Sequence, residues 1–420
     1  MKVLVVGSGG REHALAWKLL QSDTVEKVFC TPGNGGTAVL KNCENVAIAV
    51  DDFEGILNLI QANSIELVVV GPELPLSLGI TDYLQTHNIK VFGPNQEGAT
   101  IEASKSWAKD LMIEGGIPTA KSATFTDKEE AKSYIRQEGA PIVVKADGLA
   151  AGKGVVVAMS EEEALEAVEE LFAQNFNKLV IEEFLTGQEV SILALTDGLT
   201  VRPLLPAQDH KQIGEGDTGA NTGGMGVYAP TPIVDSILLD RITKEVLEPT
   251  LKTLQKRGID YRGVLYAGLM ITPEGEPKTL EFNCRFGDPE TQAVLPMLKT
   301  SLGDILLACA QQKLADLPPF EWQGGSAVCV VMAAGGYPAS YEKGKMITGI
   351  TEAEKDGATV FHAGTKLQGD DIVTDGGRVL GVTCIAENFQ SAIEATYCAV
   401  KKIHFEDMYY RRDIGHRILK

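Results

Sequence analysis

The chain has 420 residues, of which 44% are hydrophobic and 23% are charged, and its formal net charge is −19. This length predicts two to four domains, and the composition is ordinary for a folded globular protein. The acidic balance argues against general binding to nucleic acid or to an anionic membrane. An anionic substrate would therefore need a local group of lysines, arginines and amide donors.

The seven cysteines are scattered and include no Cys-Xaa-Xaa-Cys pair. This pattern predicts a reducing compartment, the cytoplasm, and no structural zinc. No signal peptide is expected, because the first apolar run, residues 3–6, is short and leads directly into glycines. No segment approaches the length of a transmembrane helix.

The first hundred residues alternate between strand and helix patterns. Residues 2–6 predict a buried parallel strand, and residues 12–20 predict a helix. Further strand-like runs occupy residues 27–30, 67–70 and 91–92. This alternation predicts an open parallel sheet that ends near residue 100. Residues 104–114 predict a helix that the following glycines and Pro118 stop.

The turn at residues 7–13 follows the first strand and opens the first helix, which makes it a ready anion site. It departs from the dinucleotide-binding pattern, since Glu12 stands at the third glycine position and the second strand is followed by no acidic residue that could hold an adenosine ribose. A simple tight turn remains open as the alternative. A second glycine loop, residues 33–37, follows the next strand, and both loops would face one crevice.

A second region begins with a strand at 141–147, a glycine-rich turn at 148–154 and a returning strand. Lys145 on the strand and Lys153 in the turn suggest a phosphate clamp. The turn does not fit the P-loop pattern, because its lysine precedes a glycine and the loop joins two strands. A hairpin with an exposed lysine is the alternative.

Ser160 and Glu163 predict a capping box for the helix that follows. Residues 178–185 predict a strand whose end, together with Glu189, could form an adenine-binding hinge. Apolar strands that end in acidic residues are common, so this pattern alone is weak. His210 is interpreted as a surface or satisfied histidine rather than as a catalytic base.

Residues 263–286 predict a hairpin, and its second strand carries the most informative pattern of the chain. Strand side chains alternate between faces, so Glu281, Asn283 and Arg285 would share one face. The other face would be apolar and would suit a core, with Phe282, Cys284 and Phe286. Carboxylate and amide oxygens suit Mg²⁺, and a neighbouring arginine can bind phosphate bidentately. An edge strand with a solvated salt bridge is the alternative.

Residues 318–325 are interpreted as a linker. The remaining residues, 326–420, alternate short strands and glycine turns with one helix at about 388–402. This pattern predicts a small α/β domain.

Taken together, the motifs resemble the ATP-grasp superfamily, and within it the glycinamide ribonucleotide synthetase family of ligases. The matching segments are residues 3–14, 33–37, 71–76, 146–155, 208–211, 221–226 and 285–292. The resemblance spans essentially the whole chain, and its last segment is the most specific. One departure is Gln212, which stands where members of the family often have arginine.

The resemblance implies an α/β fold of the ATP-grasp type, with an N-terminal open parallel α/β sheet domain and a small C-terminal α/β domain. The implied domains are a substrate-binding domain at 1–103, the ATP-grasp region at 104–317 and the C-terminal domain at 326–420. A mobile ATP-lid subdomain at about 120–188 lies within the second, and its 148–154 loop would close over the nucleotide.

The family joins glycine to 5-phosphoribosylamine and converts ATP to ADP and phosphate through a glycyl phosphate, which gives glycinamide ribonucleotide in purine biosynthesis. The resemblance therefore implies ATP and Mg²⁺ or Mn²⁺ as cofactors and these two small molecules as substrates. It also allows transient contact with neighbouring purine-pathway enzymes.

By resemblance, Arg285 and Lys145 act in catalysis, and Glu281 and Asn283 bind the metal. The implied nucleotide-binding residues are Lys105, Lys145, Gly148, Gly152, Lys153, Gly154, Glu182, Glu183, Phe184, Leu185 and Glu189. The implied substrate residues are Gly9, Gly10, Arg11, Glu12, Asn34, Gly35, Gly36, Thr37, Glu73, Asp209, Lys211, Gly223, Gly224, Met225, Gly226 and Asp288.

Three alternatives stay open at this point. The nearest is another ATP-grasp carboxylate–amine ligase or a carboxylase-like enzyme. A dinucleotide-dependent oxidoreductase is disfavoured by the absent ribose-binding acid. A non-catalytic nucleotide-binding protein is disfavoured by the intact face of Glu281, Asn283 and Arg285.

Overall fold

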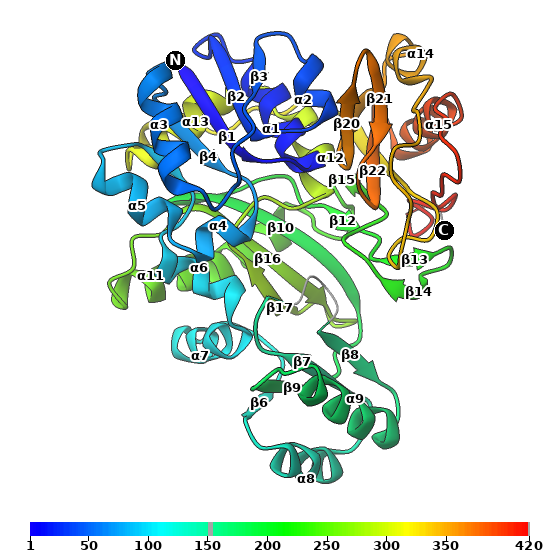
Figure 1. The fold of residues 1–420 in the computed structure, drawn as a ribbon. Helices are drawn as coiled ribbons and strands as arrows, with labels where there is room; N and C mark the ends of the chain where they lie inside the picture. Colours follow the sequence, from blue (N-terminus) through cyan, green and yellow to red (C-terminus); the bar gives the residue numbers. More distant parts are fainter. Residues whose placement is uncertain (150–153, 419–420) are drawn as a thin grey trace.

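The structure is a computed structural model that describes residues 1–149 and 154–418. Within these residues no helix has both the length and the apolar character needed to cross a membrane. Figure 1 shows a broad body made of three larger sheets and two hairpins with their helices, and a smaller unit that projects from it.

The N-terminal domain is built on a five-stranded parallel sheet with the order β3-β2-β1-β4-β5. Its strands are β1 (Lys2–Gly7), β2 (Lys27–Pro32), β3 (Cys43–Asn45), β4 (Leu67–Val70) and β5 (Val91–Phe92). The predicted strands are confirmed, because strands buried on both faces read as short continuous apolar runs. The strand order reverses around β1, and ligands of open α/β sheets bind at such a point.

Helices cover both faces of this sheet. They are α1 (Gly10–Leu19), α2 (Gly35–Val39), α3 (Phe53–Asn63), α4 (Glu73–Ser77), α5 (Ile80–Thr86) and α6 (Gln96–Ala103). The predicted helix after residue 104 is α7 (Lys105–Gly115), whose first turn is capped by the Ser104 hydroxyl. It leads the chain out of the N-terminal domain.

The projecting unit is an antiparallel sheet with two helices packed on it (Figure 1). The sheet order is β6-β9-β7-β8, with β6 (Ser122–Phe125), β7 (Ile142–Ala146), β8 (Val155–Ala158) and β9 (Leu179–Glu183), and the helices are α8 (Lys128–Glu138) and α9 (Glu161–Ala173). Half of the predicted capping box of α9 is wrong. The Ser160 hydroxyl accepts from the Glu163 amide, but the Glu163 carboxylate accepts from Met159 instead of Ser160.

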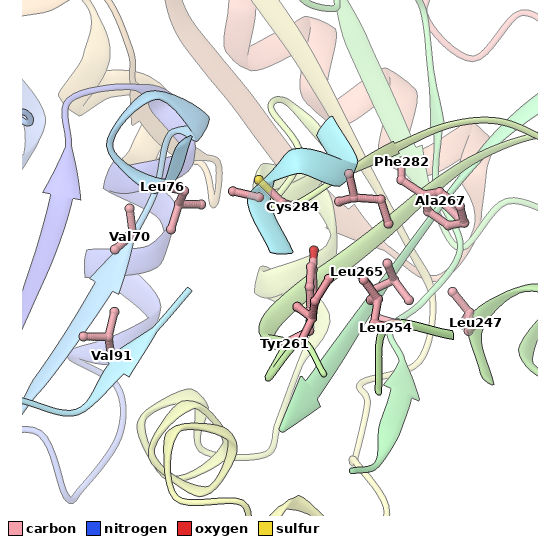
Figure 2. Close-up of a cluster of buried hydrophobic side chains, with 14 of the residues drawn as sticks. Val70, Leu76, Val91, Leu247, Leu254, Tyr261, Leu265, Ala267, Phe282 and Cys284 are labelled. Carbon is pink, nitrogen blue, oxygen red and sulfur yellow. The ribbon is translucent and has the colours of Figure 1, made fainter. Parts of the chain in front are cut away.

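A four-stranded antiparallel sheet forms the centre of the molecule, with the order β11-β10-β16-β17. Its strands are β10 (Gln188–Asp197), β11 (Val201–Pro203), β16 (Arg262–Ile271) and β17 (Pro277–Asn283), and the last two confirm the predicted hairpin. The segment between β11 and β16 includes the helical elements α10 (Ser236–Ile242), η1 (Thr243–Leu247) and α11 (Glu248–Lys256). Figure 2 shows that one apolar cluster joins this sheet to the N-terminal one, with Cys284 and Tyr261 between Val70 and Leu76 on one side and Leu265 and Phe282 on the other.

A third sheet has the order β12-β15-β18-β22-β19. Its strands are β12 (Gln208–Asp209), β15 (Gly226–Ala229), β18 (Ser326–Ala333), β19 (Thr359–His362) and β22 (Arg378–Ala386). Two of these strands come from the middle of the chain, well before residue 326. The C-terminal sheet is therefore completed by the segment that carries the polar motifs at 208–226.

The remaining elements complete this half of the molecule. They are the hairpins β13 (Gln212–Gly214) with β14 (Thr218–Asn221) and β20 (Thr365–Gln368) with β21 (Asp371–Thr374), and the helical elements α12 (Glu290–Met297), α13 (Leu302–Ala310), η2 (Leu314–Asp316), α14 (Ile350–Lys355) and α15 (Phe389–Val400). The prediction of a single helix after residue 326 is wrong, since α14 is a second helix there. Its six residues are too few to show a helical period in the sequence. The predicted linker is tethered, since its Glu321 carbonyl accepts from the Lys299 amide.

Candidate functional site

The carboxyl edge of the N-terminal sheet brings the two predicted glycine loops together. The Asn34 side-chain amide donates to the Ser8 carbonyl over 2.9 Å, which joins the loop after β2 to the loop after β1. The Asn34 side-chain oxygen accepts from the amides of Gly36 and Thr37, and so begins α2. The expectation that the two loops face one region is confirmed, because β1 and β2 are parallel neighbours that end at the same edge.

Glu12 is buried within the first loop and explains the departure from the dinucleotide pattern. Its carboxylate accepts from the Gly9 amide at 2.5 Å and pairs with the Arg11 guanidinium at 2.5 Å. A Cβ atom at Gly71 would lie 2.1 Å from this carboxylate, so a glycine there makes room for it. An acidic side chain thus occupies the space where a dinucleotide site would present a third glycine.

The predicted face of β17 is formed in part, because the strand ends at Asn283. Arg285 and Phe286 follow the strand, and Phe286 packs in a different core cluster, beside Phe92. Phe282 and Cys284 are buried on the core side, whereas Glu281 is about half exposed on the other side. The Asn283 side-chain oxygen accepts from Arg285 over 3.0 Å. The two candidate oxygen ligands and the arginine therefore lie together, with their hydrophobic neighbours anchoring the strand.

Cations surround Glu281. Crowding by protein atoms disfavours its charged form, but Lys211, Lys145, Lys105 and Arg285 outweigh that effect and lower the pKa of Glu281. The carboxylate therefore stays ionised at neutral pH. An oxygen pair bordered by several fixed cations has the donor set that a divalent metal and a polyphosphate require together.

Arg285 is held between acidic groups. Its guanidinium lies 3.0 Å from Glu102 and 3.4 Å from Glu73, and burial disfavours its charge while these carboxylates raise its pKa. Within the described residues its buried Nε–H has no hydrogen-bond acceptor. That Nε is the atom that lies 3.4 Å from Glu73, so the guanidinium is held there by an ion pair. For Glu73, burial opposes ionisation, but Arg285 and Arg11 outweigh it and lower its pKa.

The expected nucleotide residues meet where the projecting unit joins the central sheet. Lys145 lies 2.9 Å from Glu182 and donates to the Leu280 carbonyl, one residue before Glu281. Lys105 donates to the Gly148 carbonyl over 2.9 Å. Burial lowers the pKa of Lys105, a shift that Lys145 reinforces and Glu281 opposes. These lysines converge on the face that carries Glu281.

The other expected nucleotide residues differ in their surroundings. The Gly154 carbonyl accepts from Ala146, and the Glu183 carboxylate accepts from the Lys121 amide. The predicted strand at 178–185 ends at Glu183, so Phe184 and Leu185 lie beyond it. Gly152 and Lys153 lie outside the described residues.

The acid expected to hold the ribose and the lysine expected near substrate form one ion pair. Lys211 lies 2.8 Å from Glu189 and 3.9 Å from Glu281. The negative charges of Glu189 and Glu281 raise the pKa of Lys211 well above its ordinary value. They outweigh burial, which lowers this pKa. Lys211 therefore links the nucleotide residues to the candidate metal ligands.

Asp209 borders the glycine turn at 223–226. A Cβ atom at Gly224 would lie 2.7 Å from its carboxylate, so only glycine allows this approach, and Gly224 also has φ +110°. Burial and then the nearby Glu290 raise the pKa of Asp209 well above its ordinary value. The side chain of Met225 is wholly buried, and Gly226 lies within β15.

His210 is buried and satisfied, in agreement with the prediction. Its Nδ1 lies 3.2 Å from the Gly226 carbonyl, and its Nε2 accepts from the Gly415 amide. Burial lowers its pKa to about 3, and Arg417 and Arg411 reinforce this effect. The imidazole is therefore a neutral structural group.

Asp288 connects the two halves of the site. Arg378 from β22 lies 3.3 Å from its carboxylate and donates to the Gly223 carbonyl. The Arg11 amide approaches the same carboxylate at 3.4 Å. The N-terminal loop and the turn at 223–226 therefore meet through Asp288 and an arginine of the C-terminal sheet.

Sequence reasoning missed four charged residues of this region. Lys109 lies 3.2 Å from Glu182, Glu290 accepts from the Tyr266 hydroxyl at 2.5 Å, and the other two are Glu102 and Arg378. The partners of Glu102, which are the Cys284 amide and Arg285, are about 180 residues away in sequence, so no local pattern indicates them. The others gain partners only through contacts that are distant in sequence.

Comparison with known proteins agrees with this geometry over the whole chain. Three descriptions match consecutive parts: Phosphoribosylglycinamide synthetase N domain at residues 1–102, its ATP-grasp (A) domain at 103–291 and its C domain at 327–417. The chain belongs to the phosphoribosylglycinamide synthetase family. It is an ATP-dependent ligase of the ATP-grasp type.

Named relatives span the full length. A phosphoribosylamine–glycine ligase of Nostoc sp. strain PCC 7120 is 65% identical, with 100% of both chains covered. The crystal structure of the ligase of that name from Thermotoga maritima has a TM-score of 0.85 at 35% identity, covering 99% of this chain and 100% of the other. A Campylobacter jejuni biotin carboxylase, at 14% identity and a TM-score of 0.72 over 99% and 98% of the chains, shares the fold alone.

Proposed function

We propose that this protein joins glycine to 5-phosphoribosylamine and converts ATP to ADP and phosphate, which gives glycinamide ribonucleotide for purine biosynthesis. The observation that carries the proposal is the face of Glu281, Asn283 and Arg285, bordered by lysines, in a chain whose three parts match the family at residues 1–102, 103–291 and 327–417. The proposed location is the cytoplasm, and transient contact with neighbouring purine-pathway enzymes is part of the same proposal.

The chemistry requires the glycine carboxylate to be activated. A carboxylate is a poor electrophile, whereas an acyl phosphate carries a good leaving group. The carboxylate oxygen attacks the γ-phosphorus of ATP, the bond to the β,γ-bridging oxygen breaks, and ADP leaves. The amine of phosphoribosylamine then attacks the glycyl carbon, and inorganic phosphate departs with the oxygen that came from glycine.

The cationic residues serve the first of these steps. Phosphoryl transfer depends on positioning and on neutralising charge more than on covalent help from the protein. Lys105 and Lys145 are proposed to contact the ATP phosphates, and Glu182–Leu185 and Glu189 the adenosine. Arg285, a cation beside Glu281 and Asn283, would hold the transferred phosphoryl group.

Glu281 and Asn283 fit a bound divalent cation, because carboxylate and amide oxygens beside substrate phosphates are what Mg²⁺ or Mn²⁺ prefers. When bound, such an ion would neutralise charge on the phosphates. Arg285 donates to the Asn283 oxygen and so directs that oxygen toward the shared face.

The two organic substrates are assigned to the remaining residues. Gly9–Glu12, Asn34–Thr37 and Glu73 are proposed to bind phosphoribosylamine at the switch point of the N-terminal sheet. Asp209, Lys211 and Asp288, with the turn at 223–226, would border glycine and the attacking amine.

An oxygen-labelling experiment tests this proposal. Glycine carrying ¹⁸O in its carboxylate is incubated with the protein, ATP, Mg²⁺ and freshly made phosphoribosylamine, and the released phosphate is analysed by mass spectrometry. One labelled oxygen per phosphate is expected. Unlabelled phosphate would refute the acyl phosphate, whereas pyrophosphate with label in AMP would indicate nucleotidyl transfer. Reactions without the amine or without glycine are the controls.

A further inference from the structure

Asp209 and Lys211 are joined to the turn at 223–226 by a hairpin that has little packing of its own. Between these residues the chain forms the hairpin β13–β14, whose pairing is irregular and whose β14 residues are all exposed. An isolated two-stranded hairpin is only marginally stable in water. The geometry of this segment, residues 209–226, must therefore be maintained by contacts from elsewhere.

Residues 409–417 supply those contacts, and we call them the C-terminal clamp. Figure 1 shows β13 and β14 beside this end of the chain. Arg411 has no exposed surface and donates to the Gln212 carbonyl at 3.1 Å and to Asp217 at 3.0 Å. Arg417 donates to Asp217 at 3.1 Å and to the Asp209 carbonyl at 2.9 Å. The two arginines thus bind the hairpin at its turn, through Asp217, and at the start of β13, through the Gln212 carbonyl.

Three other residues of the C-terminal clamp, Asp413, Ile414 and Gly415, also contact the segment. The Asp413 carboxylate accepts from the Gly216 amide at 2.7 Å, and the Gly415 amide donates to His210. Ile414 packs against Gly226 so closely that a Cβ atom there would lie 2.7 Å from its side chain. The clamp therefore contacts the Asp209 carbonyl, His210 between Asp209 and Lys211, and the chain after Lys211.

The chemistry of these contacts is specific. A buried guanidinium is stable only when its donors are satisfied, and removing one partner of such a pair leaves an uncompensated charge. Asp217 binds both arginines, and Arg417 also reaches a carbonyl, which lysine cannot do with the same planar geometry. Loss of one arginine should therefore loosen the segment without exposing the apolar cores of the three sheets.

We propose that Arg411 and Arg417 are positioning residues that fix Asp209 and Lys211 for the reaction through Asp217 and the hairpin backbone. The proposal rests on the proposed function, because Asp209 and Lys211 are assigned there to glycine and the attacking amine. Lys105, Lys145 and Glu182 lie on other elements, and the clamped segment reaches the nucleotide residues through the pair of Lys211 with Glu189. The clamp should therefore govern the use of glycine more than the binding of ATP.

The test compares Arg417→Ala, Arg417→Lys and Asp217→Asn in the full-length protein. Steady-state phosphate release should show kcat/KM for glycine reduced about tenfold or more in Arg417→Ala, with the KM for ATP within about threefold of wild type. Arg417→Lys should recover part of the loss. Hydrogen exchange by mass spectrometry should rise in residues 209–226 while β10 and β16 keep their protection.

Arg241→Ala is the matched control, because Arg241 also binds two carboxylates, Glu245 and Glu276, and donates to a carbonyl far from the site. It should change neither readout. Wild-type exchange in residues 209–226 of Arg417→Ala and Asp217→Asn would overturn the clamp. Raised exchange with unchanged glycine kinetics would overturn its role in positioning. Wild-type protein without glycine-dependent phosphate release would refute the proposed function, and the exchange data would still decide whether the clamp holds the segment.

Discussion

At the scale of single residues, the site is a set of charges that satisfy one another. Glu281 is ionised because lysines surround it, and Arg285 is fixed between Glu102 and Glu73. Such arrangements are electrostatically preorganised, because the cations already occupy the positions where negative charge would be bound. Glu281 and Arg285 are therefore the residues to substitute first.

Glu281→Gln is expected to abolish turnover and leave the fold intact, because the side chain is half exposed and keeps its size while it loses an anionic oxygen. Phosphate release at increasing Mg²⁺ concentration measures this. Glu274→Gln, at an exposed position in the turn of the same hairpin, is the control and should behave as wild type. Wild-type turnover of Glu281→Gln at ordinary Mg²⁺ would remove this carboxylate from the metal site.

Arg285→Lys is expected to lower kcat more than it changes the KM for ATP. Lysine retains the charge but loses the planar fork, in which Nε faces Glu73 while Nη2 contacts Glu102 and Asn283. A decrease of about a hundredfold in kcat is expected for the loss of one oriented donor in the transition state. If only the KM for ATP rises, Arg285 acts in ground-state binding.

At the scale of elements, short helices are set in place by residues from distant parts of the chain. The loop before α2 is a clear case, because Gly36 lies between two buried histidines. A Cβ atom at Gly36 would come within 2.5 Å of His13 and 2.6 Å of His362. The Asn34 amide also donates to the His362 carbonyl. The second glycine loop is therefore fixed from α1 on one side and from β19 on the other.

Gly36→Ala is expected to destabilise the protein by about 1–3 kcal/mol, because an added methyl group must displace packed rings. Gly324→Ala is the control, since a Cβ atom there meets no other atom within 4 Å. Thermal unfolding followed by circular dichroism compares the two variants with wild type. Equal melting temperatures for both variants would show that the histidine rings can move aside without a loss of stability.

At the scale of the whole molecule, the N-terminal and C-terminal domains meet through buried imidazoles. His13 accepts from the His362 amide at 2.8 Å, and Trp17 of the same helix stacks edge-on against Phe361. Burial lowers the pKa of His362 to about 4, and burial followed by the nearby His362 lowers the pKa of His13. Both rings are therefore neutral in the folded protein at neutral pH.

This interface predicts a loss of stability in mild acid. The unfolded-state pKa of histidine, about 6.5, lies above the folded-state value, so between these values the unfolded state binds the extra proton. Stability therefore falls as pH decreases from about 7.5 to 5.5, by about 1 kcal/mol for His362. His362→Asn should show a smaller decrease in its urea midpoint over this range, measured by tryptophan fluorescence. An identical pH dependence would mean that His362 does not contribute.

Much of the fold was readable from the sequence because the signals are local. Buried parallel strands such as β1 and β4 appear as apolar runs, and the β16–β17 hairpin appears as alternation around a turn rich in glycine and proline. The same alternation placed Glu281 and Asn283 on one face. The ATP-grasp family was recognised for a similar reason, since its motifs are short and continuous.

The rest was decided by tertiary structure. No local period could show that β12 and β15 complete the C-terminal sheet, or that Arg378 would bind Asp288 and Gly223. The partner of a buried charge depends on which chain segments pack together, and packing is a property of the whole molecule. The sequence by itself therefore determined the strands, the glycine loops and the residue types of the site. The tertiary structure decided which of these residues meet, and which distant arginines hold them.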